Sequence, residues 1–91
     1  MSAFVQIWKR IVEYEGSEFR QVRGKTFTYT VSGNALVPST TNYLIPRSQI
    51  EKAWKRMPVA GPGGLQDLVA PSYLYAILSD PRISIRTEEI L

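Results

Sequence analysis

Residues 26–32 alternate strictly between apolar and hydroxyl side chains, and no other feature of the chain constrains its fold as strongly. Phe27, Tyr29 and Val31 take one face, while three threonines and a serine take the other. Successive side chains of a β-strand point to opposite faces, so this period of two predicts a half-buried strand over residues 26–32. Such a strand needs neighbouring strands and a layer that covers its apolar face.

Three short segments are candidate partners for this strand. Gly33-Asn34 suits a two-residue hairpin turn and predicts a strand at residues 35–37, which Pro38 limits or places at a sheet edge. Residues 43–45 and 19–23 favour two further strands. The chain therefore contains enough strand-forming segments for one small, mostly antiparallel sheet.

Two segments before residue 60 have the spacing of amphipathic helices. The first carries an apolar stripe at helical spacing, with Ser2 suited to the N-cap and Gly16 to the stop; the stripe is formed by Phe4, Ile7, Trp8 and Ile11. The second begins with Ser48-Gln49-Ile50-Glu51, which has the spacing of a capping box, and predicts a helix over residues 49–57 that ends at Pro58.

The last third of the chain predicts a helix followed by a strand. Gly61–Gly64 is expected to be a loop, with one helical turn over residues 65–69. Pro71 suits the first turn of a helix over residues 71–79, on which Tyr75 faces away from the core. Ile83 and Ile85 alternate with polar residues and predict a strand before a fraying tail, residues 87–91.

Together these elements predict an α+β fold. We expect a single compact domain over residues 1–91, with a short, mostly antiparallel sheet of three to five strands covered by about three helices on one face. An apolar fraction of 44% is sufficient for a core, while a chain of 91 residues leaves modest stability that dimerisation would increase. We therefore expect a homodimer.

The composition excludes several kinds of chemistry. The chain has no cysteine and no histidine, so disulfides, thiolate metal sites and imidazole catalysis are excluded. Lys9 and Arg10 interrupt the apolar N-terminal stretch, and no run is long enough to span a bilayer. We therefore expect a cytoplasmic, non-enzymatic protein without cofactor, metal or membrane partner.

Charge is distributed unevenly and gives the main indication of function. Residues 19–60 carry seven basic side chains and one acidic side chain, a net +6, although the whole chain is only +3. Such a field attracts polyanions or acidic protein surfaces. The candidate nucleic-acid-binding residues are Arg20, Arg23, Lys25, Arg47, Lys52, Lys55 and Arg56. On the predicted helix, however, the same charges also fit an ordinary solvated face.

Other readings of the sequence remain open or fail. A protein-interaction or self-assembling domain would use Tyr75 on the last helix or the edge strand near Val37. A small enzyme or ligand-binding protein would place its site beneath Gly61–Gly64. Gly24-Lys25-Thr26 lacks the earlier glycine and following helix of a phosphate-binding loop. The 13 residues between the two later helices are too many for a helix-turn-helix motif.

Overall fold

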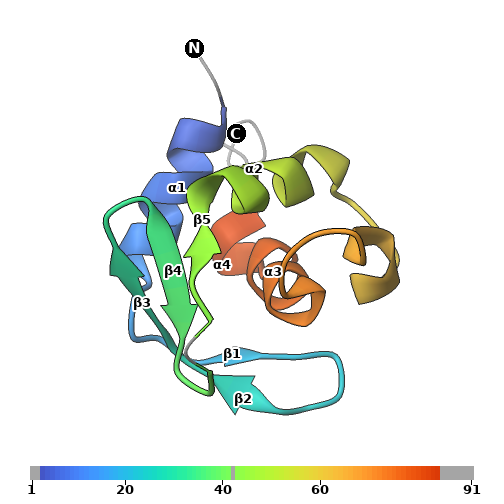
Figure 1. Cartoon of the computed structure of the whole chain (residues 1–91), viewed down its shortest axis with the longest axis horizontal. Coiled ribbons are helices and arrows are strands. Elements are labelled where there is room, and N and C mark those ends of the chain that lie inside the picture. The colour runs from blue at the N-terminus through green and yellow to red at the C-terminus, as the bar shows by residue number, and fades with distance from the viewer. Residues whose placement is uncertain (1–2, 42, 85–91) are drawn as a thin grey trace.

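The computed structural model describes residues 3–41 and 43–84. Its elements, shown in Figure 1, follow one another in the order α1 (Phe4–Glu13), β1 (Phe19–Arg20), β2 (Thr26–Phe27), β3 (Tyr29–Ser32), β4 (Ala35–Pro38), β5 (Ile45–Pro46), α2 (Arg47–Arg56), the 3-10 helix η1 (Pro62–Leu65), α3 (Pro71–Leu78) and α4 (Pro81–Ser84). The predicted α+β class is confirmed.

The strands form two small antiparallel sheets, one of β1 and β2 and one in the order β3-β4-β5. The predicted continuous strand over residues 26–32 is therefore divided at Thr28. The Thr28 N–H donates to the Ser39 hydroxyl and the Thr28 carbonyl accepts from the Ser39 N–H, at 3.0 and 2.8 Å. The bond from the Ser39 N–H continues the β3–β4 register to Thr28, but the Thr28 N–H bonds the Ser39 hydroxyl instead of the Ser39 carbonyl. The ladder therefore ends here, while the alternation of buried and exposed side chains continues.

The hairpin predicted at Gly33-Asn34 is confirmed, because Ser32 pairs directly with Ala35 across a two-residue turn. Gly33 has φ +61°, a conformation that glycine adopts without strain. The strand expected at residues 35–37 forms and ends at Pro38, whereas the alternative that Pro38 places it at a sheet edge is wrong. β4 lies between β3 and β5 and is the central strand of its sheet, because residues after Pro38 return to pair Ile45 with Leu36.

Both edges of the three-stranded sheet are protected. The Val31 N–H donates to a carboxylate oxygen of Glu15 at 2.7 Å, and the Tyr29 carbonyl accepts from the Gly16 N–H at 3.0 Å. These bonds cover the side of β3 that faces away from β4. The opposite edge, β5, is two residues long and ends in Pro46, which has no N–H to donate.

Three predicted helices are confirmed with shifted ends. α1 buries the expected stripe; the proposed N-cap Ser2 lies outside the described residues. α3 begins at Pro71, as predicted. α2 begins at Arg47, two residues before the predicted start, with Pro46 as its N-cap and no side-chain capping bond. The predicted capping box is therefore wrong, because Ser48 already lies inside the helix.

Two predictions for the last third of the chain are wrong. The helical turn expected over residues 65–69 forms earlier, as η1, which includes most of the expected glycine loop. The segment from Ile83, expected to be a strand, belongs to the short helix α4. The Asp80 carboxylate accepts the Arg82 N–H at 2.9 Å and holds this turn, while Ile83 is fully buried. Ile85 and Arg86 lie outside the described residues.

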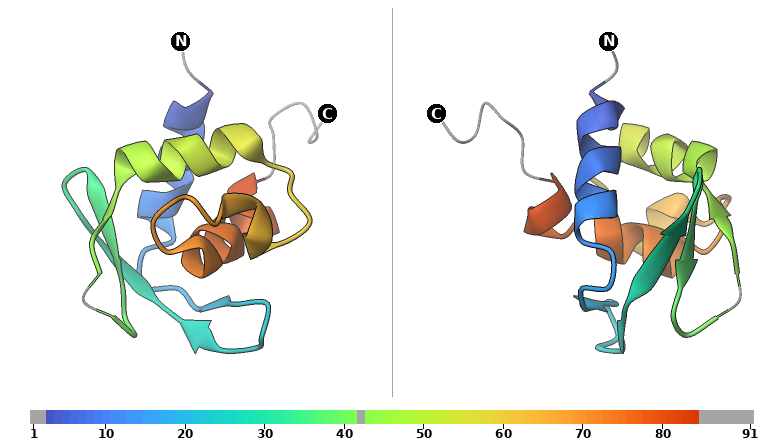
Figure 2. Two further views of the ribbon diagram at one scale, coloured as in Figure 1. Left: turned by 45° about the vertical axis from the view of Figure 1, so that its right-hand side comes forward. Right: turned by 90° about the vertical axis from the view of Figure 1, so that its left-hand side faces the viewer.

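One hydrophobic core joins both sheets and the helices, with Phe4, Leu36, Ile50, Leu74 and Ile83 among its buried members. The helices surround this core at different angles rather than forming one layer over one face of the sheet (Figure 2). α2 lies at one end of the molecule and the β1–β2 hairpin at the other, with α3 between them (Figures 1 and 2). Within residues 3–41 and 43–84, no helix has both the length and the apolar character needed to cross a bilayer.

Candidate functional site

The fold separates the seven candidate basic residues into two groups. Arg20, Arg23 and Lys25 belong to the β1–β2 hairpin, whereas the other four belong to α2. Because the hairpin and α2 occupy opposite ends of the molecule, the seven side chains do not form one continuous surface (Figures 1 and 2). The two groups are therefore two separate candidate surfaces.

Two of the α2 cations are already paired with acids. The Arg56 guanidinium donates to both carboxylate oxygens of Asp67, at 2.5 and 2.7 Å. These hydrogen bonds lower the pKa of Asp67 to about 2, so that this carboxylate stays ionised at neutral pH. Lys55 lies 3.9 Å from Glu51 one helical turn earlier. Both pairs reduce the positive field of the helix.

The remaining α2 cations differ from each other. The Arg47 guanidinium is half-buried, with its central carbon 5.6 Å from the centre of the Phe4 ring and 5.3 Å from that of Trp8. This cation–π contact joins the start of α2 to α1 and gives Arg47 a structural role. Lys52 is exposed and has no ion pair within the described residues. α2 thus offers one uncommitted cation.

The hairpin cations are in the opposite situation. Arg20, Arg23 and Lys25 are all exposed, and none forms an ion pair with another described residue. The sequence contains no acidic residue from position 19 to position 50. The hairpin therefore carries three exposed positive charges that form no ion pair in the described part of the chain.

Local backbone geometry fixes the tip that carries these charges. The Gly24 N–H donates to the Gln21 carbonyl and the Gln21 N–H donates to the Lys25 carbonyl, both at 2.8 Å. Gly24 has φ +94°, which favours glycine at this position of the turn. Arg20 pairs with Thr26 across the hairpin, and Lys25 and Arg23 follow in the turn that closes it.

The base of the hairpin is anchored in the core. Phe19 and Phe27 face inward, and the Phe19 ring lies 5.4 Å from that of Tyr29. Arg82 covers the Phe19 ring at 4.1 Å and donates to the Glu18 carbonyl at 2.8 Å. Asp80 pairs with Arg82 at 3.0 Å and neutralises it. This anchoring role could not be predicted from local sequence patterns, because Arg82 is 63 residues from Phe19.

The sequence also did not indicate which apolar side chains are exposed. Of residues 43–45, expected to form a strand, only Ile45 pairs with β4, together with Pro46. Tyr43 and Leu44 lie in the loop before β5. Their exposed fractions are 56% and 52%, and that of Val22 at the hairpin tip is 66%. β-forming residues in a loop resemble a strand in sequence, and only the pairing distinguishes them.

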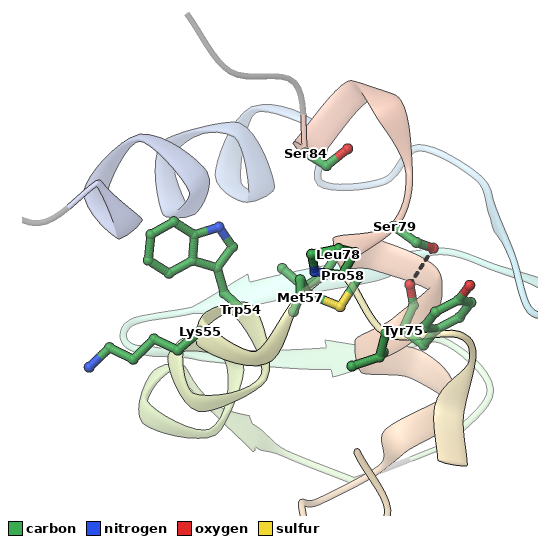
Figure 3. A pocket seen from close by; sticks show the side chains of 9 residues that line it. Trp54, Lys55, Met57, Pro58, Tyr75, Leu78, Ser79 and Ser84 are labelled. Atoms are coloured by element: carbon green, nitrogen blue, oxygen red, sulfur yellow. Dashed lines mark hydrogen bonds between the residues drawn. The ribbon is translucent and has the colours of Figure 1, made fainter. Parts of the chain in front are cut away.

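A cavity of about 610 Å³ lies between α2, α3 and α4. Figure 3 shows Trp54 and Tyr75 on its opposite sides, with Met57, Pro58 and Leu78 between them. Tyr75, expected to face outward, is half-buried and its hydroxyl donates to the Ala60 carbonyl at 3.5 Å. Val37, the other expected interface residue, is half-buried in β4. These two positions therefore offer only limited surface.

The ligand site expected beneath Gly61–Gly64 does not coincide with this cavity. Met57, Pro58 and Val59, which precede this loop in the chain, line the cavity, and none of the loop glycines does. The backbone of Gly64 packs tightly on Val59, since a Cβ added there would lie 2.9 Å from the valine Cβ. Within the described residues, no group of three or more acids could hold a metal ion.

Comparisons with models of protein families, with curated proteins and with solved structures each find no match to this chain. The class defined by the fold is a small α+β domain with two antiparallel sheets and an uncompensated basic hairpin.

Proposed function

We propose that the protein is a non-enzymatic binding module that meets an anionic partner, the backbone of a nucleic acid, through Arg20, Arg23 and Lys25. The observation that supports this is the presence of three exposed cations on one hairpin, without ion pairs in the described part of the chain. The paired cations of α2 do not contribute to the contact. The proposed binding surface therefore contains three of the seven basic residues predicted from the sequence.

Three cations define the expected energetics. Each phosphate neutralised releases bound counterions, so log Kobs falls with log salt by about 0.9 per contact for duplex DNA and about 0.7 for a single strand. Three contacts predict slopes of about −2.7 and −2.1. Binding that depends on phosphates carries little sequence information and has a Kd of roughly 10⁻⁴ to 10⁻⁶ M at physiological salt.

Fluorescence anisotropy with labelled DNA and RNA tests the proposal, at salt concentrations between about 50 and 200 mM. The test variant is Arg20→Gln/Arg23→Gln/Lys25→Gln. Its matched control, Lys9→Gln/Lys52→Gln/Lys55→Gln, removes the same charge from exposed positions away from the hairpin.

The wild type and the control are expected to bind with slopes between about −2 and −3, and the hairpin variant is expected to lose both affinity and slope. Absence of binding at low salt, or binding that is indifferent to salt, would overturn the proposal. An equal loss in the control would overturn it as well, because the effect would then come from net charge alone.

A protein-interaction or homo-oligomerising domain is the second candidate, and the cavity beside Tyr75 favours it. Trp54 and Tyr75 are both half-buried and face this cavity, and aromatic side chains of this kind are enriched at protein interfaces. Sedimentation velocity over a wide concentration range tests it. A concentration-dependent dimer that Tyr75→Ala disrupts supports this function, and a strict monomer counts against it.

A further inference from the structure

The three most exposed large apolar side chains in the described part of the chain are Val22, Tyr43 and Leu44. Val22 lies at the hairpin tip between Arg20 and Arg23, and the other two lie in the β4–β5 loop. This loop and the hairpin both lie at the end of the molecule away from α2, on opposite sides of that end in both views of Figure 2 (Figures 1 and 2). Apolar side chains and uncompensated cations are thus presented at one end.

Direct contacts fix the loop against the hairpin. The two hydrogen bonds between Thr28 and Ser39 join the residue after β2 to the start of the loop. Tyr73 on α3 contacts both segments: its ring packs edge-on against Phe27 at 4.8 Å, and its hydroxyl forms a hydrogen bond with Thr40 at 2.5 Å. These contacts hold the start of the loop in a fixed position relative to the base of the hairpin.

The Tyr43 ring is available for a ligand. It makes no ring contact with another described residue, and its exposed fraction is 56%. The Tyr43 N–H donates to the Thr41 hydroxyl at 3.2 Å, which helps to hold the backbone of the loop. An exposed flat aromatic face suits an unstacked base, whose own faces are free, and a single strand several nucleotides long can reach from this loop to the cations of the hairpin. In a duplex, neighbouring bases already cover those faces.

We propose that this end of the molecule binds single-stranded nucleic acid, with Tyr43 stacking on a base while Arg20, Arg23 and Lys25 contact the phosphates. This inference rests on the proposed function and adds the class of nucleic acid. Leu44 and Val22 contact sugars and base edges on either side of the stack. Stacking tolerates every base, so recognition is largely independent of sequence.

The test compares wild type, Tyr43→Leu and Tyr43→Phe by anisotropy at low salt, with labelled oligo-deoxythymidylate of about 16 nucleotides as the probe. Loss of one stacked base is expected to weaken binding of Tyr43→Leu by about 5- to 150-fold, whereas Tyr43→Phe keeps the wild-type affinity. A duplex probe of equal length is expected to bind all three proteins equally. Thermal melts check that each variant is folded.

The outcomes separate this inference from the proposed function. Unchanged affinity of Tyr43→Leu for the single strand, together with loss of binding in the hairpin variant, overturns the inference and leaves the proposed function intact. Retained binding in the hairpin variant overturns both. Tighter binding to the duplex, or to phosphatidylserine vesicles at equal salt, also overturns the inference, because the exposed apolar side chains would then serve a different partner.

Discussion

The Tyr29 hydroxyl offers the clearest single test of how this fold is held together. Tyr29 is only 1% exposed, and its hydroxyl donates to the Ile11 carbonyl at 2.5 Å. Ile11 lies in the last turn of α1, where helix carbonyls lack intrahelical partners. The neighbouring carbonyls of Arg10 and Val12 accept the N–H groups of Tyr14 and Glu15. The Tyr29 hydroxyl therefore satisfies a buried acceptor and joins α1 to β3.

Tyr29→Phe removes this hydroxyl and keeps the ring that packs 5.4 Å from Phe19. Leaving a buried acceptor unsatisfied costs about 1–3 kcal/mol. We expect a loss of about 2 kcal/mol in the free energy of unfolding, or a Tm lower by roughly 8–16 °C for a domain of this size. Urea unfolding followed by tryptophan fluorescence measures the loss, and an unchanged m-value indicates that both proteins unfold from equally compact states.

Alkaline pH provides a second test of how much the Tyr29 hydroxyl stabilises the fold. Burial raises the pKa of Tyr29 above its ordinary value, because the buried site disfavours the phenolate. A raised pKa means that its stabilisation is complete below about pH 10 and is lost as the pH rises above that value. The stability difference between wild type and Tyr29→Phe should therefore shrink by about 1.4 kcal/mol per pH unit above pH 10. A difference below about 0.5 kcal/mol at neutral pH, or one that is constant above pH 10, would refute the reasoning.

Two further substitutions test local features. Asp67→Asn should remove the stability that comes from the lowered pKa of Asp67, so its Tm should differ from wild type above about pH 4 and match it as the pH falls towards 2. Thermal melts across this range measure the effect, and a difference that persists at the lowest pH contradicts it. Ala70 has φ +51°, a left-handed conformation that is strained for a residue with a Cβ. Ala70→Gly should raise the free energy of unfolding by up to about 1 kcal/mol in urea titrations, and a comparable loss would contradict this.

The features predicted from sequence depend on local patterns. The α1 stripe, the Gly33-Asn34 turn and the start of α3 at Pro71 are each set by residues within about one turn or hairpin, and all three form as expected. The division at Thr28 depends instead on Ser39, eleven residues away. Alternation records which face is buried and does not record which sheet a strand joins, so the pattern continued through the break.

The errors at the C-terminal end have a similar cause. Ile83 and Ile85 fit a strand by spacing, but Asp80 accepts the Arg82 N–H and starts a helical turn there. For the candidate site, the sequence showed which residues are basic but not which of them are paired after folding. Arg56 meets Asp67 and Arg47 meets the rings of α1 only after folding, whereas the hairpin cations keep the isolation that an acid-free sequence already suggests.

The protected edges of the three-stranded sheet limit how copies of this chain can associate. Backbone pairing of β3 with another molecule would first have to displace the Glu15 carboxylate and the Gly16 amide. β5 offers too short a template, and Pro46 cannot donate to one. The three-stranded sheet is therefore a poor template for backbone pairing between molecules, and an oligomer that uses this sheet has to be built from side-chain contacts between folded surfaces.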